Sequence, residues 1–352
     1  MTTRPFTFIL LRDITVPGDV WETTRHTDED TNPMARADEL LVEPKKAEAF
    51  GLDGFSAGDH FYDSPDALID CMASAMVTKR IKFTQTVLCN DFRNPALLAK
   101  MIASMDVFSG GRIELGIGAG YNDAEYRQAS YQFDENKVRV ARLREAVHII
   151  RELLDKDEPV TFKGQYYHID GLMNLPRPVQ KHVPIRLGGG GKVMLRIAAD
   201  YADLVDIMTL GVYPSGLAKN PQEFTYRSFA DKINFVKECA KERADRITFA
   251  VVLFRFTPAA TMEEGARIIH GEMEAAYQMH GHDDGFPLSV EEIIESPYFL
   301  MGTEGDMAAK MEKRRGEVDL TQDLIFSRFL HGMKPLVDRL KSADRKLGLR
   351  QA

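Results

Sequence analysis

Hydrophobic runs and amphipathic stretches alternate along most of the chain. Short apolar or β-branched runs predict strands at Phe6–Leu11, Gly54–Asp59, Ile81–Leu88, Arg112–Leu115, Ile185–Leu187, Leu204–Met208, Ile247–Phe256 and Asp323–Phe326. Apolar positions at helical spacing predict helices over Pro33–Phe50, Asp66–Thr78, Ala96–Phe108, Glu135–Leu154, Lys192–Tyr201, Arg227–Lys241, Met262–Met279, Glu304–Arg315 and His331–Leu347. An irregular segment with several prolines, at about 155–183, predicts an insertion that carries a hairpin.

Eight predicted strands that alternate with helices indicate the α/β class with a parallel sheet. The count of eight favours a closed (β/α)8 TIM barrel, and an open doubly wound sheet is the alternative. Barrels of this kind commonly form one unit, so we expect a single domain over residues 1–352. Function in a barrel lies on the loops that follow the strands. We therefore expect the segments at about 12–33, 211–226 and 281–301 to cover the mouth.

Aromatic side chains in and near these loops suggest an apolar pocket at the mouth. They are Trp21, Phe61, Tyr62, Phe92, Tyr126, Tyr213 and Phe286.

Composition narrows the possible partners to small molecules. The chain has 45 Lys and Arg against 53 Asp and Glu, and its basic residues form no continuous block. The sequence therefore gives no indication of a basic surface that would bind the nucleic-acid backbone. No apolar run approaches the roughly 18 residues of a membrane span, so we expect no membrane insertion. The three cysteines are widely spaced and form no paired motif, which argues against a disulfide framework and a zinc ribbon. A reducing cytoplasm is the expected compartment.

Glycines at alternate positions, Gly116, Gly118 and Gly120, follow the fourth predicted strand. A dinucleotide fingerprint would require a further glycine where Tyr121 or Asp123 stands, so a Rossmann NAD site is disfavoured. Two interpretations stay open: a tight exit from the strand, or a backbone that a flat ring or a phosphate tail can approach closely.

The run Gly188, Gly189, Gly190 and Gly191 also follows a strand and opens a helix. It is not a P-loop, because Val193 follows Lys192. Backbone N–H groups at such a helix start favour anions, so the run predicts a phosphate site, with a flexible turn as the alternative.

Asp59 and His60 follow the second predicted strand. Ser64 and Pro65 supply the cap and first turn of the next helix, which leaves Asp59 free to act on a ligand. The imidazole of His60 suits proton transfer near neutral pH, and a structural pair is the alternative. His26 and Trp21 are weaker candidates, because a surface loop explains them.

The stretch His280, Gly281, His282, Asp283 and Asp284 resembles a metal cluster only in composition. It follows a helix and lacks helical ligand spacing, so we expect no metal there.

Several motifs in the first two thirds of the chain occur in a familiar order. They are Asp59-His60-Phe61, Thr86-Val87, Asn94-Pro95-Ala96-Leu97-Leu98-Ala99, Ser109-Gly110-Gly111-Arg112, Gly116 to Asn122 with Glu125-Tyr126, and Gly188 to Gly191. The ordered set, from about Phe6 to Met208, resembles the bacterial luciferase-like oxidoreductase superfamily. The stretch Gly188 to Arg196 with Ala198-Ala199 is more similar to its deazaflavin-dependent members than to its alkanesulfonate monooxygenases.

This resemblance implies a barrel that binds FMN or the deazaflavin coenzyme F-420, with the ring at the mouth and the phosphate at the later loops. It places Thr86 and Val87 at a strand bulge with a cis peptide behind the ring, and Gly118, Ala119, Gly120, Tyr121 and Asn122 beside and beyond it. Asp59 would contact the ring and His60 would be the base. Homodimers are common in this family.

Three functions follow from the resemblance. The first is F-420-dependent hydride transfer, with His60 moving the matching proton. The second is a monooxygenase that uses reduced FMN from a separate flavin reductase, and the third is a flavin-binding barrel without catalysis. The sugar-phosphate dehydrogenase branch carries a tryptophan shortly after the histidine and a glutamate at the place of Tyr121, and both are missing here, so the sequence does not identify the substrate.

Overall fold

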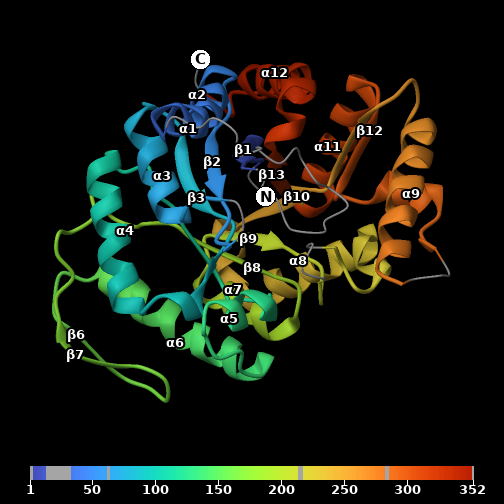
Figure 1. The fold of residues 1–352 in the computed structure, drawn as a ribbon. Helices are drawn as coiled ribbons and strands as arrows, with labels where there is room; N and C mark the ends of the chain where they lie inside the picture. The colour runs from blue at the N-terminus through green and yellow to red at the C-terminus, as the bar shows by residue number, and fades with distance from the viewer. Residues whose placement is uncertain (1–2, 13–32, 62–63, 213–216, 282–284, 351–352) are drawn as a thin grey trace.

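A computed structural model describes residues 3–12, 33–61, 64–212, 217–281 and 285–350 (Figure 1). Its main sheet has nine strands in the order β3-β2-β1-β13-β10-β9-β8-β5-β4, and every pair is parallel. The bounds are β1 Thr7–Leu11, β2 Gly54–Ala57, β3 Lys82–Gln85, β4 Leu88–Cys89, β5 Leu115–Gly118, β8 Ile185–Gly189, β9 Leu204–Ile207, β10 Thr248–Leu253 and β13 Leu320–Phe326.

The two ends of this strand order belong to one stretch of chain, so the sheet closes on itself. β3 and β4 are separated only by Thr86 and Val87, and the peptide between these two residues is cis. On the β3 side, the N–H of Phe83 donates to the carbonyl of Arg112 at 2.8 Å, just before β5. If β3 and β4 are counted as one interrupted strand, the sheet has the eight strands of a (β/α)8 barrel. The predicted barrel is confirmed, and the doubly wound alternative is wrong because that sheet would have two free edges.

Helices surround the barrel (Figure 1). Their bounds are α1 Pro33–Leu40, α2 Val42–Ala49, α3 Ala67–Met76, α4 Pro95–Ser109, α5 Asp123–Gln128, α6 Asn136–Asp155, α7 Lys192–Tyr201, α8 Tyr226–Ala240, α9 Met262–Met279, α10 Val290–Glu295, α11 Glu304–Val318 and α12 Leu330–Lys346. The main core lies between strands and helices, while a smaller apolar cluster inside the barrel contains Ile9, Leu11, Ala250, Val252 and Leu324. That inner cluster supports the mouth from below.

Several predicted elements need correction. The helix predicted over Pro33–Phe50 is divided into α1 and α2. The cap of α3 is Asp66 rather than Ser64, because the Asp66 carboxylate accepts from the N–H groups of Leu68 and Ile69. The predicted strand Ile247–Phe256 is split, and its second part continues as β11 Arg255–Pro258, which pairs with β12 Phe299–Gly302 in a small separate sheet. The hydrophobic pattern gave no sign of β12 or α10.

The predicted hairpin is present in the insertion. β6 Val160–Lys163 and β7 His168–Leu172 pair in antiparallel fashion and lie at the periphery in Figure 1. Short 3-10 turns complete the fold, at η1 Asn90–Phe92, η2 Pro221–Phe224, η3 Lys241–Arg246 and η4 Ser327–Phe329. In the part of the chain that the structure describes, none of the helices has the length and apolar character that crossing a bilayer requires.

Candidate active site

A cavity of about 570 Å³ lies at the carboxyl ends of the barrel strands. This volume falls within the range of roughly 300–1,000 Å³ that is usual for small-molecule sites. Every residue that the sequence marked as catalytic or cofactor-binding lines it, namely Asp59, His60, Thr86, Val87, Gly118, Ala119, Gly120, Tyr121, Asn122, Gly188, Gly189, Gly190 and Gly191. Barrel closure therefore brings together residues that are up to 132 positions apart in sequence.

The floor of the cavity contains the interruption between β3 and β4. The cis peptide expected from the family resemblance is present between Thr86 and Val87, and the Thr86 hydroxyl lies 2.6 Å from that of Ser56. Val87 packs against two glycines on neighbouring strands. A Cβ atom on Gly118 would lie 2.7 Å from Val87 Cγ2, and one on Gly188 would lie 3.4 Å from Val87 Cγ1. These glycines are needed for close packing of the strands, whatever binds above them.

The other two alternating glycines also have structural roles. A Cβ atom on Gly116 would lie 1.7 Å from the carbonyl oxygen of Gln85, which leaves no room for a side chain. Gly120 has a φ of 77°, and its Cβ would lie 2.2 Å from the hydroxyl of Tyr126. Gly118 and Gly120 line the cavity as well, so the two interpretations of the motif are compatible.

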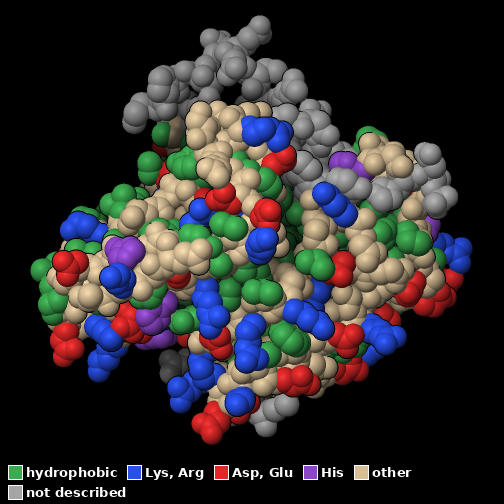
Figure 2. All heavy atoms as spheres, turned by 90° about the horizontal axis from the view of Figure 1, so that it is seen from below, with side chains coloured by type: hydrophobic (Ala, Val, Ile, Leu, Met, Phe, Trp, Pro, Cys, Tyr) green, Lys and Arg blue, Asp and Glu red, His purple; other side chains and the backbone are tan. Residues whose placement is uncertain are grey.

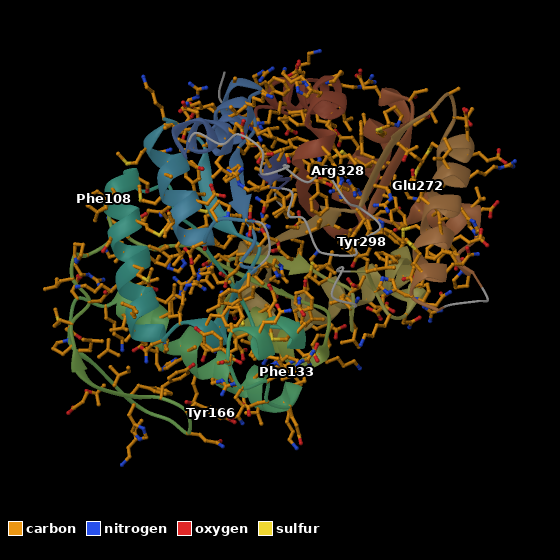
Figure 3. All side chains as sticks on the ribbon, in the orientation of Figure 1. Phe108, Phe133, Tyr166, Glu272, Tyr298 and Arg328 are labelled. Atoms are coloured by element: carbon orange, nitrogen blue, oxygen red, sulfur yellow. The ribbon has the colours of Figure 1, made fainter. Side chains whose placement is uncertain are left out.

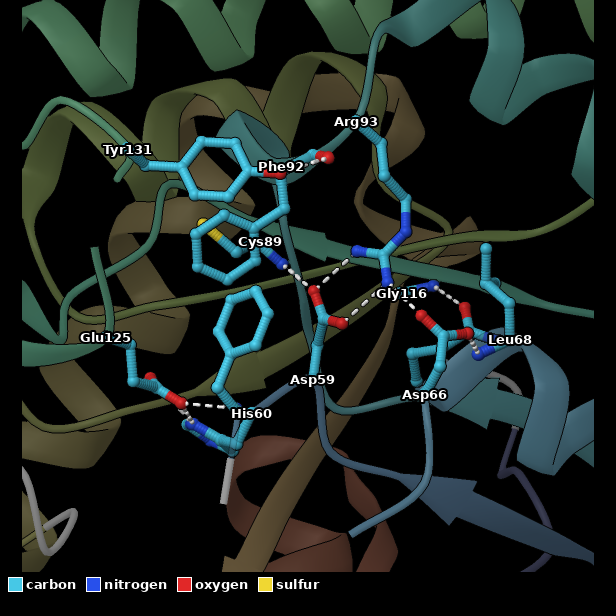
Figure 4. Close-up of polar contacts among 12 residues, drawn as sticks. Asp59, His60, Asp66, Leu68, Cys89, Phe92, Arg93, Gly116, Glu125 and Tyr131 are labelled. Carbon is cyan, nitrogen blue, oxygen red and sulfur yellow. Dashed lines mark hydrogen bonds and ion pairs between the residues drawn. The ribbon is translucent and has the colours of Figure 1, made fainter. Parts of the chain in front are cut away.

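His60 is held on the cavity wall by a buried carboxylate that the sequence had not marked as a site residue. Its Nδ1 lies 3.1 Å from Oε1 and 3.0 Å from Oε2 of Glu125, and the N–H of Phe61 donates to Oε1 at 2.8 Å (Figure 4). The side chain of Glu125 is 3% exposed. Tyr121 approaches the His60 ring edge-on, with the ring centroids 6.0 Å apart. Glu125 belonged to the motif set of the resemblance, but only the fold shows that it faces His60.

Asp59 turns away from His60 toward Arg93 (Figure 4). Arg93 donates to both carboxylate oxygens, at 2.7 and 2.8 Å, and the N–H of Cys89 donates to Oδ2 at 2.8 Å. Arg93 also binds Asp66 at 2.7 Å. Burial alone would lower the pKa of Arg93, but these two carboxylates outweigh it and raise that pKa. The expectation that Asp59 is unengaged is therefore wrong, because a neighbouring arginine fixes it.

Tyr126 anchors the short helix α5 that carries Glu125. Its hydroxyl donates to Asp91 at 3.0 Å and lies 3.0 Å from the sulfur of Cys89. Arg142 in turn contacts both oxygens of Asp91 at 2.8 Å. Burial raises the pKa of the Cys89 thiol to about 12, so this sulfur is a neutral thiol at physiological pH.

The glycine run joins β8 to α7. Gly191 is the N-cap of α7, and it contributes no side-chain cap. The first N–H groups of such a helix have no acceptor within the helix, which makes this end of the cavity suitable for an anion. A Cβ atom on Gly190 would lie 2.4 Å from the carbonyl oxygen of Met208, so the run also packs tightly against the loop after β9.

Beneath the cavity, the barrel interior holds a buried charged pair. Arg186 is fully buried and contacts Asp206, Gln322 and, at 3.6 Å, Glu114. Burial raises the pKa of Asp206, although the attraction of Arg186 opposes this. Asp206 lines the cavity and thus forms part of its floor.

Basic side chains line the cavity as well, and the sequence had not marked them. They are Arg12, Arg139, Lys219, Arg255 and Arg328. Arg12 pairs with Asp70 at 2.6 Å and Arg255 with Glu272 at 2.9 Å, and the Arg328 guanidinium lies 4.1 Å from the Phe326 ring centroid. Figure 3 places Arg328 and Glu272 on the later part of the barrel. The face seen in Figure 2 carries Lys and Arg side chains that are interspersed with Asp and Glu. Arg12, Arg255 and Arg328 stand one or two residues after the ends of β1, β10 and β13. Their position directly after a barrel strand is the signal in the sequence that could have identified them.

Some aromatic candidates do not join the cavity. Phe92 and Tyr126 line it, whereas Phe61 is exposed and Phe286 stacks on Tyr277 of α9 with centroids 5.3 Å apart. The described part of the segment 281–301 contains α10 and most of β12. Trp21, His26, Tyr62, Tyr213 and, from the disfavoured metal cluster, His282, Asp283 and Asp284 lie outside the described residues.

Comparisons with known proteins agree with this geometry. A family model described as luciferase-like monooxygenase matches residues 19–318. An F-420-dependent glucose-6-phosphate dehydrogenase from Amycolatopsis mediterranei is 38% identical over 173 residues, which cover 47% of this chain and 51% of that protein. The chain thus spans about half the length of such curated relatives.

Two solved structures share the fold over nearly the whole chain. An F-420-dependent secondary alcohol dehydrogenase, bound to an F-420–acetone adduct, superposes with a TM-score of 0.66 at 18% identity, covering 96% of this chain and 99% of the other. A long-chain alkane monooxygenase superposes with a TM-score of 0.71 at 14% identity, covering 100% and 93%. Since dehydrogenase and monooxygenase share this barrel, the fold alone does not select the reaction.

Proposed function

The chain belongs to the luciferase-like monooxygenase family, and we propose that it is an oxidoreductase that uses coenzyme F-420 to move a hydride to or from a small organic substrate. The observation that carries the proposal is His60, fixed by the buried Glu125 on the wall of a cavity of about 570 Å³. An oriented imidazole beside a ligand cavity suits general acid–base catalysis. The F-420 dependence named for the 38% identical relative supports the choice of coenzyme.

The residues present fit a flat ring with an anionic tail. Around Val87, the glycines of β5 and β8 leave the cavity floor without large side chains, and a Cβ on Gly118 would collide with Val87. In this proposal Asp59, Thr86, Val87 and Gly118 to Asn122 hold the ring, and Gly188 to Gly191 hold the phosphate. When bound, the coenzyme would supply the hydride chemistry, and the protein positions it and excludes water.

His60 has the proton-transfer role in this proposal. It lies on the cavity wall, and it takes a proton from an alcohol substrate or returns one to a carbonyl product. Asp59 is kept as a contact to the ring whose orientation Arg93 sets through two hydrogen bonds of 2.7 and 2.8 Å. Because its carboxylate is already bound, Asp59 acts by position rather than by exchanging a proton.

The substrate in this proposal is a small molecule that carries negative charge. Lys219, Arg255 and Arg328 stand on segments that follow different barrel strands, and they line the same cavity. Cationic side chains in a partly enclosed site attract anions and orient them. The tyrosine at position 121 sets this chain apart from the sugar-phosphate branch, so we propose the charge class and not a particular sugar phosphate.

Cofactor titration tests the proposal. We expect F-420 to bind with micromolar or tighter affinity, followed through its fluorescence, and His60→Ala to lower turnover by about 10²-fold or more with little change in that affinity. Tight binding of reduced FMN alone would instead favour a monooxygenase that needs a flavin reductase. Binding without turnover across alcohols, aldehydes and activated alkenes would favour a non-catalytic barrel.

We also propose a homodimer formed through α3 and α4. Each helix exposes apolar side chains on one face: Ile69 and Met76 on α3, and Leu97 and Phe108 on α4. The two helices contact each other, and Phe108 points outward from α4 (Figure 3). Exposed apolar surface of this kind is typical of protein interfaces. Light scattering after size-exclusion chromatography should give twice the mass of 39.7 kDa, and Phe108→Glu should give the monomer.

A cytoplasmic location completes the proposal. The cysteines Cys71, Cys89 and Cys239 are all free thiols, which is typical of a reducing compartment.

A further inference from the structure

We infer that Glu125 fixes the tautomer of His60 and thereby selects Nε2 as the nitrogen that exchanges the catalytic proton. This inference rests on the proposed function for its consequence in turnover, but its structural basis can be tested on the protein alone. Glu125 acts through His60 and is a positioning residue.

The contacts define which ring nitrogen carries hydrogen. Both carboxylate oxygens of Glu125 lie near Nδ1, at 3.1 and 3.0 Å. A carboxylate only accepts hydrogen bonds, so Nδ1 must donate and keeps its hydrogen in both the neutral and the charged imidazole. The proton that His60 gains or loses is therefore carried by Nε2. Fixing one ring nitrogen by a carboxylate sets the role of the other.

The carboxylate has little freedom to move. The N–H of Phe61 donates to Oε1 at 2.8 Å, and the side chain is 3% exposed. Its helix α5 begins at Asn122, whose side chain accepts from the N–H of Ala124, and Tyr126 ties the same helix to Asp91. Asp59, the other carboxylate next to His60 in sequence, is bound by Arg93 and does not take this role.

A single substitution should reverse the tautomer without changing the size of the side chain. In Glu125→Gln, the N–H of Phe61 still requires an oxygen at the place of Oε1, so the amide nitrogen takes the place of Oε2, 3.0 Å from Nδ1. That nitrogen can only donate, so a hydrogen kept on Nδ1 would face the N–H groups of the amide, and the tautomer in which Nδ1 accepts from the amide is favoured. The neutral imidazole would carry its hydrogen on Nε2, where it cannot take up a proton.

For an alcohol substrate, the coenzyme when bound would supply the acceptor for the hydride that leaves the C–H bond, so that the alcohol would be oxidised and the coenzyme reduced. The part of this chain is to take the hydroxyl proton on Nε2 of His60 as the carbonyl forms. With Nε2 already protonated, the neutral imidazole accepts no proton there. We expect kcat of Glu125→Gln to fall by about 10²-fold or more, with F-420 affinity changed less than about threefold.

The test combines tautomer and turnover in the full-length protein. With 15N-labelled histidine, long-range proton–nitrogen correlation at pH 8 should show His60 with its hydrogen on Nδ1 in the unmodified protein and on Nε2 in Glu125→Gln. The chain has nine histidines, and the signals of His60 are identified as those that disappear from the spectrum of the His60→Gln variant. Asp123→Asn, the same chemical change on the exposed face of α5, should alter neither tautomer nor kcat.

Two outcomes separate this inference from the proposed function. If His60 carries its hydrogen on Nε2 in the unmodified protein, or if Glu125→Gln leaves the tautomer unchanged while circular dichroism shows a folded protein, the inference is wrong. If the tautomers behave as expected but no F-420-dependent turnover is found, the proposed function is wrong. If Glu125→Gln does not fold, Glu125→Asp tests the same point, since a retained carboxylate should keep hydrogen on Nδ1 and preserve the pH profile of kcat.

Discussion

Removing Arg93 should destabilise the protein strongly, because it leaves a buried carboxylate without its partner. In Arg93→Met, the Asp59 carboxylate loses both guanidinium hydrogen bonds, of 2.7 and 2.8 Å. Among the described residues, it keeps only the N–H of Cys89 as a donor. The side chains of Arg93 and Asp59 are 13% and 7% exposed, so little water can replace the lost contacts. Breaking a buried ion pair from one side typically costs about 3–5 kcal/mol.

This cost converts into a measurable change of melting temperature. At about 2.1 cal/mol/K per residue near 60 °C, unfolding of 352 residues has an entropy of about 0.7 kcal/mol/K. We therefore expect Arg93→Met to lower the Tm by about 4 to 7 °C, followed by circular dichroism at constant protein concentration. Asp59→Asn alone should cost less, since Arg93 keeps Asp66 at 2.7 Å.

The double variant isolates the contribution of charge. Asp59→Asn in the Arg93→Met background removes the unpaired charge and should recover part of the lost Tm, which gives a non-additive cycle. Arg127→Met is a matched control on the exposed face of α5, where the side chains of Arg127 and its ion-pair partner Asp123 are 67% and 48% exposed. This substitution should change stability by less than about 1 kcal/mol. A Tm for Arg93→Met within 1 °C of the unmodified protein, or a double variant less stable than both single ones, would refute the reasoning.

Further predictions concern glycines, thiols and a helix cap. Gly116→Ala should prevent soluble expression, because its Cβ would lie 1.7 Å from the Gln85 carbonyl oxygen. By contrast, a Cβ on Gly316 in α11 would meet open space, so Gly316→Ala should raise the free energy of unfolding by about 0.5–1 kcal/mol in denaturant titrations. In the native protein at pH 8, Ellman's reagent should modify Cys239 well before Cys71 and Cys89, since burial raises the pKa of each of these two thiols to about 12; three fast thiols would contradict this. Burial raises the pKa of Asp66, but the N–H of Ile69 and Arg93 outweigh it and the net pKa is lowered. The stabilisation from the charge of Asp66 is therefore fully present above the ordinary pKa of 3.8 and is lost as the pH falls through the lowered pKa. At pH 7, we expect Asp66→Ala to be less stable than the unmodified protein by about 0.5–2 kcal/mol. This difference in the free energy of unfolding should narrow below pH 3.8 and not widen.

The alternation of hydrophobic patterns was sufficient to predict the class of fold and many of its elements. The helices Lys192–Tyr201 and Met262–Met279 have the predicted bounds, because their apolar faces, starts and ends are all local features of the sequence. α10 was missed because it is only six residues long, and β12 was missed because its pairing with β11 in a small sheet joins segments that are far apart in sequence. Strand ends were less accurate for the same reason: β5 begins at Leu115, where the predicted strand ends.

By itself the sequence determined which segments form the strands of the barrel, which loops follow them, and that glycines and an Asp59-His60 pair stand at strand ends. Only the tertiary structure decided which side chains meet there. His60 and Glu125 are 65 positions apart, and Asp59 and Arg93 are 34 apart. Whether such residues touch depends on closure of the barrel, on strand register and on the direction of each side chain, which local patterns do not encode. The carboxylate expected to be available is therefore bound, and the one that orients the histidine comes from another loop.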